Sequence, residues 1–224
     1  MADIAKLFVE FDIWLELGRT MFMTFIPVVF AYIVGLPLGI WCVVTDKNGI
    51  KPNKVVNQVL NIIINLGRSI PFVILLVMLV PFTRFVVGTS LGPVGALVPL
   101  TVACIPFVAR MVEQSLKEID QGVIDAAICM GATDFQIITK VYLVETIPSL
   151  IRGFAITTIT LIGYTAMAGA VGARGLGYLA VNRGYENNNL PLMYLCVVMI
   201  IVLVEVIQII LEFVSKKIDK KKIN

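Results

Sequence analysis

The residues of this sequence that could do covalent or acid–base chemistry form no recognisable catalytic motif. There is no histidine, so a nucleophile activated by histidine is excluded, although Asp, Glu and Lys bases remain possible in principle. No phosphate-binding loop of the form G-x4-G-K-[ST] occurs, and the nearest glycine cluster, 172–177 (GARGLG), lacks a lysine. An enzyme that acts by itself is therefore disfavoured, and no catalytic residue is assigned.

The cysteines do not suggest a site either. They are scattered, without a C-x-x-C pair, and three of them lie inside apolar runs. This distribution favours small side chains that fill helix contacts over a disulfide or a metal site. We therefore predict no metal and no cofactor in this chain from its four cysteines, Cys42, Cys104, Cys129 and Cys196.

The residues best suited to transmit a movement lie between Glu118 and Ile151. This stretch interleaves charges, helix formers and apolar residues, and Gly131 interrupts it. Small Ala126 and Ala127 allow a partner surface to approach closely, and Gly131 permits a sharp turn between two short helices. The stretch therefore predicts a helix–glycine–helix piece held by a partner. The alternative is an amphipathic helix whose polar face only meets lipid headgroups.

The composition indicates the kind of protein in which this stretch is embedded. Hydrophobic residues make up 58% of the chain and charged residues 15%, with a mean hydropathy of +0.94. A soluble chain is usually about one quarter charged, so we predict an all-α polytopic membrane protein. The length of 224 residues favours a single transmembrane domain, 1–224. No nucleic-acid partner is expected.

Five transmembrane helices are predicted from the apolar runs. Acidic residues before the first run argue against a cleaved signal peptide, so the first span is expected to be retained. Arg68 is interpreted as an anchor that reaches back to the headgroups, with a ligand for a substrate carboxylate as the alternative. The expected spans are about 21–44, 67–82 with an interfacial lead-in at 55–66, 92–112, 149–170 and 190–214.

Lysine and arginine near the ends of the spans set the orientation. The turn at 45–54, the flanks of the central stretch and the tail at 215–224 are rich in these residues, and alternating spans put all three on one side. By the positive-inside rule that side is the cytoplasm. We therefore expect the N-terminus outside, the C-terminus in the cytoplasm, and attraction of the tail to anionic membrane lipid.

The central spacing resembles the EAA loop of permease subunits of ATP-binding-cassette importers, E-A-A-x3-G-x9-I-x-L-P. Here the pattern reads Asp125-Ala126-Ala127-x3-Gly131-x9-Val141-x-Leu143. Asp125 and Val141 keep the charge and shape of the usual Glu and Ile. Val144 replaces the usual proline, which leaves the helix continuous there, with Pro148 available a turn later.

Longer strings between about Gly67 and Gly184 resemble the permease of bacterial methionine importers. Arg174 stands where the family usually has a small residue in its glycine run. This departure is expected to alter the outer gate or its contact with a binding protein. The matching strings are RSIPFVILLV (68–77), PFTR (81–84), VGTSLG (87–92), VPLT (98–101), PFVARMVE (106–113), MGAT (130–133), TLIGYTAMAGAVGARGLG (160–177) and RGY (183–185).

The resemblance implies the fold of a type I ABC importer permease, with a cytoplasmic helix-turn-helix coupling loop at residues 118–147. It implies a homodimer in the bacterial cytoplasmic (inner) membrane, two separate ATPase subunits that hold ATP and magnesium, and an external methionine-binding protein, often a lipoprotein. Methionine, in its L- and also D-form, would cross by alternating access. The implied ATPase-coupling residues are Asp125, Ala126, Ala127, Met130, Gly131, Ala132 and Leu143.

The glycine-rich segment from Gly163 to Gly177 lies at the expected outer end of the fourth span. Its glycines allow close helix approach or a non-helical gate. Candidates for the substrate path or gate are Tyr164, Thr165, Met167 and Gly169, with packing within the dimer as the alternative. Two other functions stay open: the same permease with another amino acid or small solute as cargo, and an ATP-independent channel.

Overall fold

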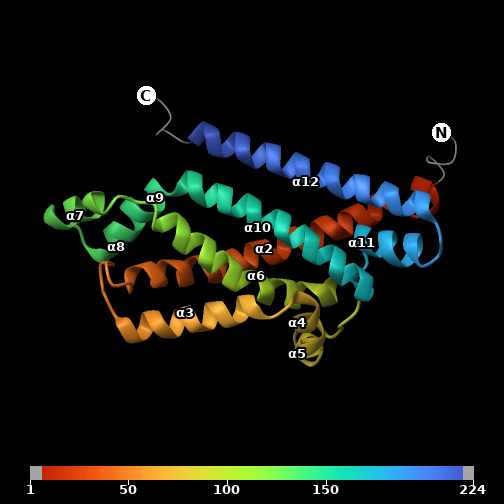
Figure 1. The fold of residues 1–224 in the computed structure, drawn as a ribbon, viewed down its shortest axis with the longest axis horizontal. Coiled ribbons are helices and arrows are strands. Elements are labelled where there is room, and N and C mark those ends of the chain that lie inside the picture. The colour runs from red at the N-terminus through yellow and green to blue at the C-terminus, as the bar shows by residue number, and fades with distance from the viewer. Residues whose placement is uncertain (1–6, 219–224) are drawn as a thin grey trace. The chain divides into compact units, whose positions relative to one another are not determined.

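The computed structural model describes residues 7–218, so the last lysines of the tail lie outside the described residues. Helices make up most of this range, and it contains no strand (Figure 1). In chain order the helices are α2 (Ile13–Val44), α3 (Lys54–Ser69), α4 (Phe72–Met78), α5 (Val80–Val87), α6 (Gly92–Leu116), α7 (Gln121–Cys129), α8 (Asp134–Gln136), the π-helical η1 (Ile137–Tyr142), α9 (Leu143–Glu145), α10 (Ile147–Ala168), the π-helical η2 (Gly169–Ala173), α11 (Leu176–Tyr178), the π-helical η3 (Leu179–Tyr185) and α12 (Leu190–Ile218).

Within the described range, four helical segments are long and apolar enough to cross a membrane. They are α2, α6, α10 together with η2, and α12. The remaining predicted span, the second in chain order at about 67–82 with its lead-in at 55–66, falls on a broken pair, α3 and α4, which reaches a span's length only if both helices are counted together. The count of five therefore depends on that pair and stays a prediction.

α2 begins at Ile13, well before residue 21, where the first span was expected to begin. The sequence placed Glu16 outside the apolar segment because burying a carboxylate without partners is costly. In the structure Glu16 is buried and forms an ion pair with Arg19. Its Oε2 also accepts a hydrogen bond from the backbone N–H of Gly175 at 2.6 Å. These partners explain why the helix continues through an acidic residue.

α3 is one unbroken helix across both the expected lead-in at 55–66 and the expected start of a span at 67. It ends just before Ile70-Pro71, because the residue before a proline is disfavoured in a helix. Ile64 of α3 packs against Cys42 of α2 and Ala109 of α6. α3 therefore lies beside α2 and α6, as Figure 1 shows.

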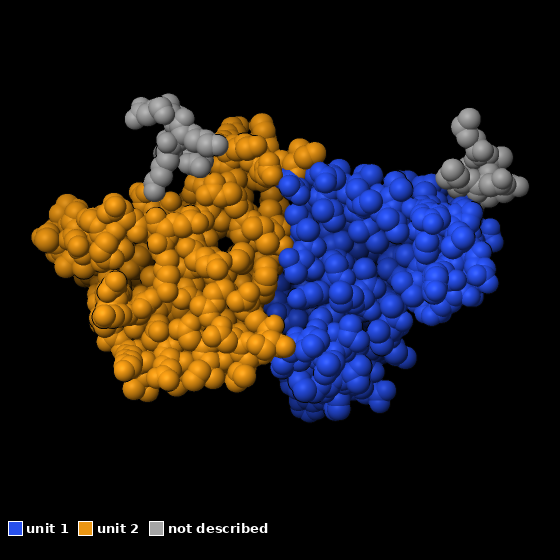
Figure 2. All heavy atoms as spheres, in the orientation of Figure 1, with its two compact units in different colours: residues 1–30, 70–104, 158–208 blue, residues 31–69, 105–157, 209–224 orange. Residues whose placement is uncertain are grey.

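The described chain divides into two compact units, coloured separately in Figure 2. The first comprises 7–30, 70–104 and 158–208, and the second 31–69, 105–157 and 209–218. In the first unit, the buried core contains Ile13, Leu176, Leu179, Ala180, Leu192 and Cys196. Each unit draws on three separate stretches, so neither is a continuous segment of sequence.

Small residues set the close approach of α2 and α6 in the second unit. A Cβ added at Gly39 would lie 2.6 Å from the carbonyl oxygen of Ala109, and one at Gly35 would lie 2.8 Å from Val108. Close backbone contact of this kind is a common means of helix association in membranes. At the helix ends that the sequence predicts to face the cytoplasm, Ser215 of α12 donates a hydrogen bond to the carbonyl of Pro148 at the start of α10, at 3.0 Å.

Candidate functional site

The coupling loop contains the helix–glycine–helix turn that its sequence predicts. Asp120 caps α7, because its carboxylate accepts the backbone N–H of Gly122 at 2.7 Å. After Cys129 the chain turns at Gly131, whose φ of +77° lies in the left-handed region that favours glycine. The N–H of Ala132 then donates to the carbonyl of Ala127 at 3.1 Å and closes the end of α7.

The second half of the loop is a continuous helical run through α8, η1 and α9. Thr133 and Gln136 form a capping box, in which each side chain accepts the other residue's backbone N–H. The run continues through Val144, where the related pattern has proline, and ends at Glu145. The departure at Val144 thus leaves this helix unbroken, and Pro148 falls in the first turn of α10.

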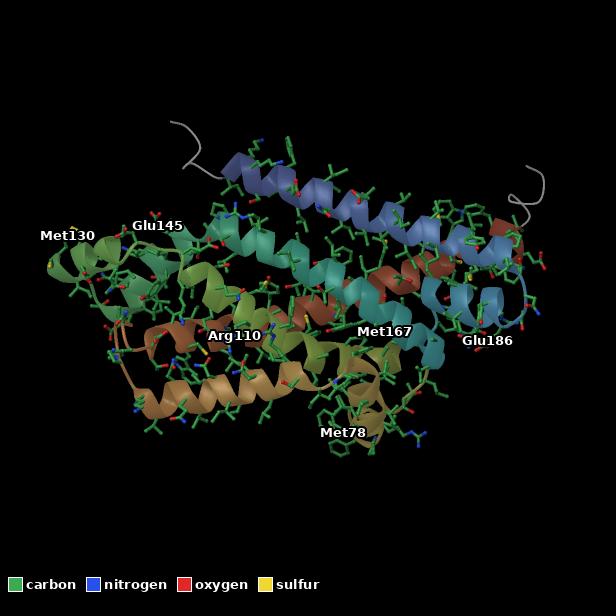
Figure 3. All side chains as sticks on the ribbon, in the orientation of Figure 1. Met78, Arg110, Met130, Glu145, Met167 and Glu186 are labelled. Carbon is green, nitrogen blue, oxygen red and sulfur yellow. The ribbon has the colours of Figure 1, made fainter. Side chains whose placement is uncertain are left out.

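One face of the loop packs inward and the other is exposed. Ile124, Ile137 and Tyr142 are buried, and Tyr142 is only 1% exposed. At the tip, Met130 is 81% exposed and Phe135 74% exposed, and Figure 3 shows Met130 projecting from the end of the loop. Exposed apolar side chains gathered on a loop mark a surface for a partner.

The residues expected to couple to an ATPase divide between these two faces. Asp125 lies on the exposed face, where its carboxylate accepts a hydrogen bond from the Gln121 side chain at 3.2 Å. The other coupling residues are buried or half-buried on the inward face of the loop. Exposed are Asp125, Ala126, Met130 and Gly131, buried is Ala127, and half-buried are Ala132 and Leu143.

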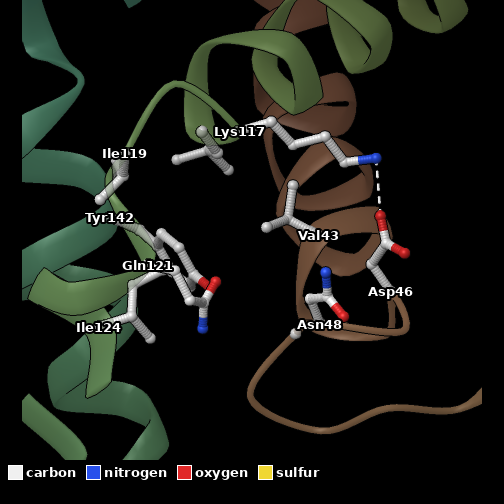
Figure 4. Close-up of a pocket in the computed structure, with 10 residues that line it drawn as sticks. Val43, Asp46, Asn48, Lys117, Ile119, Gln121, Ile124 and Tyr142 are labelled. Carbon is white, nitrogen blue, oxygen red and sulfur yellow. Dashed lines mark ion pairs between the residues drawn. The ribbon is translucent and has the colours of Figure 1, made fainter.

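A pocket of about 300 Å³ lies between the coupling loop and the ends of α2 and α6, as Figure 4 shows. On the side of the pocket away from the loop, Lys117 forms an ion pair of 2.7 Å with Asp46, and the same lysine reaches Glu113 at 2.9 Å. A second ion pair, between Lys51 and Asp134 at 2.6 Å, ties the turn after α2 to α8. Charge therefore ties the loop to the turn after α2 and ties the ends of α2 and α6 to each other, while packing holds the loop against both. The pocket is lined by Val43, Asp46, Asn48, Gly49, Leu116, Lys117, Ile119, Gln121, Ile124 and Tyr142.

The ion pairs and burial around this pocket shift the pKa values of three residues. The hydrogen bond from Lys117 holds the pKa of Asp46 below its usual value, against the opposing effect of burial. Burial alone would lower the pKa of Lys117, but its hydrogen bonds to Asp46 and Glu113 outweigh it and raise the pKa. Burial raises the pKa of the Tyr142 hydroxyl. The ion pair between Lys117 and Asp46 is consequently intact at neutral pH.

The candidate path residues are mostly engaged in packing. The ring of Tyr164 stacks on Phe72, with the ring centroids 4.7 Å apart. Thr165 is buried and donates its hydroxyl to the carbonyl of Ile162 at 2.7 Å, whereas Met167 is exposed. A Cβ at Gly169 would lie 2.6 Å from the backbone nitrogen of Tyr178, so this glycine allows close packing. Their role as a path or gate remains a prediction.

Sequence reasoning missed the partners that hold the glycine-rich segment. Besides Glu16, the Thr20 hydroxyl accepts the backbone N–H of Leu176 at 2.9 Å. Arg174 beside them has a φ of +70°, and its guanidinium lies over the ring of Tyr178. Glu16 and Thr20 are four residues apart in a helix, so their side chains lie on the same face. This spacing is the one sequence signal that could have predicted a shared neighbour.

Comparison with known proteins gives the family. Residues 35–221 match the family described as binding-protein-dependent transport system inner membrane component. The chain belongs to this family. A probable D-methionine transport system permease protein of Pasteurella multocida is 47% identical over 203 residues, covering 91% of this chain and 94% of the relative. A methionine import system permease protein of Bacillus subtilis is 48% identical over 177 residues, 79% of this chain and 80% of the relative.

Solved structures agree with this membership. An inward-facing methionine ABC transporter contains a chain that superposes with a TM-score of 0.90 at 44% identity, covering 91% of this chain and 94% of that one. An amino acid ABC transporter chain superposes with a TM-score of 0.75 at 17% identity, which shows the fold alone. This inner membrane component is thus an ABC importer permease with the all-helical type I fold, as predicted.

Proposed function

We propose that this chain is the permease subunit of an ATP-driven importer of methionine. The names of its relatives support the cargo, because proteins at 47% and 48% identity are methionine transport permeases. The observation that carries the ATP-driven part is the coupling loop, with exposed Met130 and Phe135 around the turn at Gly131. Two copies of the chain enclose the solute path, and two separate ATPase subunits bind the loops and hydrolyse ATP.

The anchoring of the coupling loop supports a route for movement. ATP binding draws the two ATPase subunits together, and each bound loop moves with its subunit. Buried Tyr142 and the ion pair between Lys51 and Asp134 fix the loop to its neighbours, so the loop moves as one piece with the ends of α2 and α6. Ser149 of α10 donates a hydrogen bond to Ser115 of α6 at 3.1 Å, which joins α10 to the same movement.

The remaining parts of the proposal concern orientation and partners. The coupling loop and the C-terminus face the cytoplasm, and the N-terminus faces outward. A methionine-binding protein, often a lipoprotein, delivers cargo on the outer side, and anionic lipid contacts the basic tail. The alternative cargo is another amino acid or small solute.

The test is uptake by proteoliposomes that contain this chain and its ATPase subunit. Methionine uptake that needs hydrolysable ATP and the binding protein supports the proposal. Uptake of another solute that excess methionine leaves unchanged would overturn methionine as cargo, and flux that persists without nucleotide would favour a channel.

A native cysteine provides a separate test of docking. Cys129 is exposed at the end of α7, whereas Cys42, Cys104 and Cys196 are buried. We expect a maleimide to label Cys129 in the solubilised permease and the bound ATPase subunit to protect it. Labelling that proceeds equally fast with saturating ATPase would contradict docking at this surface. Labelling in a Cys129→Ser variant sets the background from the other three cysteines.

A further inference from the structure

The position of Arg68 in α3 raises a question that the proposed function does not answer. Gly67 lies against Pro106 of α6, where an added Cβ would be 3.0 Å from the proline ring. Pro106 stands ten residues before the end of α6 at Leu116, which corresponds to about 15 Å along the helix axis. Since the hydrocarbon core is about 30 Å thick, an α6 that reaches the membrane surface at Leu116 would place Arg68 near mid-membrane depth.

This depth argues against the anchor role given to Arg68 from the sequence. That interpretation assumed a span beginning near residue 67, but α3 begins at Lys54 and Arg68 lies in its last turn. A side chain at mid-membrane depth is too short to reach the headgroups. The Arg68 side chain is exposed and makes no hydrogen bond or ion pair with any described residue. A cation there needs water or an anionic partner.

Three faces of α3 show what surrounds Arg68. Leu60 and Ile64 pack inward against α2 and α6, and Val59, Ile62 and Leu66 form an exposed apolar face. The third face is a polar stripe with spacings of three and four residues, which keep its members on one side of a helix. The polar stripe consists of Lys54, Gln58, Asn61, Asn65 and Arg68.

The polar stripe is compatible with water along its whole length. Lys54, Gln58 and Asn61 line a hollow of about 880 Å³ at the start of α3. Farther along, Asn65 accepts a hydrogen bond from Arg110 of α6 at 2.7 Å, and Figure 3 shows Arg110 between α6 and α3. Arg110 is itself paired with Glu113, so its charge is neutralised. Arg68 at the deep end of the stripe keeps a positive charge without a partner.

We propose that Arg68 binds the carboxylate of an amino acid as it crosses the membrane. A guanidinium can form two parallel hydrogen bonds with a carboxylate, a geometry that lysine lacks. The amides of the polar stripe then accompany the zwitterion from Arg68 toward the hollow at the cytoplasmic end. This proposal rests on the proposed function, because it takes the cargo to be an amino acid.

The experiment compares methionine with methionine amide, which lacks the carboxylate. Binding of each is measured on the solubilised complex of permease and ATPase without the binding protein. We expect Arg68→Gln to lower methionine affinity about 10- to 100-fold, with little effect on the amide. Arg68→Lys should keep part of the preference for methionine, because it keeps the charge. Lys217→Gln, which removes an exposed cation at the end of α12, should leave the preference unchanged.

Other outcomes overturn the proposal. If Arg68→Gln keeps the wild-type preference for methionine, the carboxylate does not meet Arg68. If that variant separates the two copies of the permease in cross-linking, Arg68 contacts the second copy instead. If added phosphatidylglycerol competes with methionine in the wild type but not in Arg68→Gln, the occupant is a lipid phosphate.

Failure of the proposed function gives a different result. Wild-type proteoliposomes that do not import methionine refute that function alone. The comparison at Arg68 is then made with the imported solute and its amide. A cargo without a carboxylate overturns both proposals.

Discussion

Gly131→Ala tests whether the turn in the coupling loop is needed for docking. A left-handed backbone costs a residue with a Cβ roughly 1–2 kcal/mol relative to glycine. No atom lies within 4 Å of a Cβ added at Gly131, so steric conflict with neighbours adds nothing. Because the tip is exposed, the free variant relieves this strain by opening the turn, and binding has to restore it. At 1.4 kcal/mol per tenfold change, affinity for the ATPase subunit should fall about 5- to 30-fold.

A matched control comes from Gly88, at the end of α5. Its φ is +78° and an added Cβ would also meet no atom within 4 Å, so Gly88→Ala introduces the same backbone strain far from the coupling loop in sequence. Affinity is measured by surface plasmon resonance with solubilised permease and purified ATPase subunit. We expect Gly88→Ala to bind normally and Gly131→Asn to be close to wild type, because asparagine tolerates left-handed backbone. Unchanged affinity in Gly131→Ala, or an equal loss in Gly88→Ala, would refute the reasoning.

Three further predictions concern the anchors of the loop and of the glycine-rich segment. Tyr142→Ala removes a side chain that is 1% exposed and should destabilise the packed loop by about 3 kcal/mol, seen as faster hydrogen exchange in α7 to α9; unchanged exchange would contradict a packed loop. Glu16→Ala leaves Arg19 and the N–H of Gly175 without their acceptor and should cost about 1–3 kcal/mol in thermal unfolding, since Arg19 is partly exposed, whereas Glu16→Gln, which keeps an acceptor, should cost less; equal losses would show that the acceptor is unimportant. The stability difference between wild type and Asp46→Asn should persist above pH 3.8, the ordinary aspartate value, and disappear as the pH falls through the lowered pKa of the folded state. A stability difference between wild type and Asp46→Asn that survives in strong acid would rule out the ion pair as its source. At alkaline pH, the contribution of Lys117 to stability is fully present below pH 10.5 and is lost as the pH rises through the raised pKa of Lys117.

Local rules made the coupling loop predictable. Gly131 is needed because a sharp turn requires positive φ, a requirement that does not depend on distant parts of the chain. The exposed face could be predicted for the same reason, although the partner that covers it came from the resemblance. Ala127, which the sequence grouped with Ala126 on the partner's side, is instead buried on the face of Ile124, three residues earlier in the helix.

Long-range contacts were not predictable in the same way. Glu16 and Gly175 are 159 positions apart, and no local sequence pattern indicates that they are in contact. α3 resembles an interfacial helix by its own amphipathic pattern, because its polar stripe looks like a face turned to headgroups. Tertiary contacts place it along the spans, among them those of Ile64 and Gly67 with α6. That placement changes the role assigned to the Arg68 side chain.

The length of α12 makes bilayer thickness a variable for this protein. The apolar part of α12, residues 190–214, extends about 37 Å, beyond a hydrocarbon core of about 30 Å, and such mismatch is relieved by tilting or by local thickening of the lipid. Thicker membranes permit a more upright helix and thinner ones demand more tilt. Either change moves the end of α12 that carries Ser215, whose hydrogen bond to Pro148 adjoins the coupling loop. Acyl-chain length in reconstituted vesicles should therefore alter the transport rate at constant ATPase occupancy.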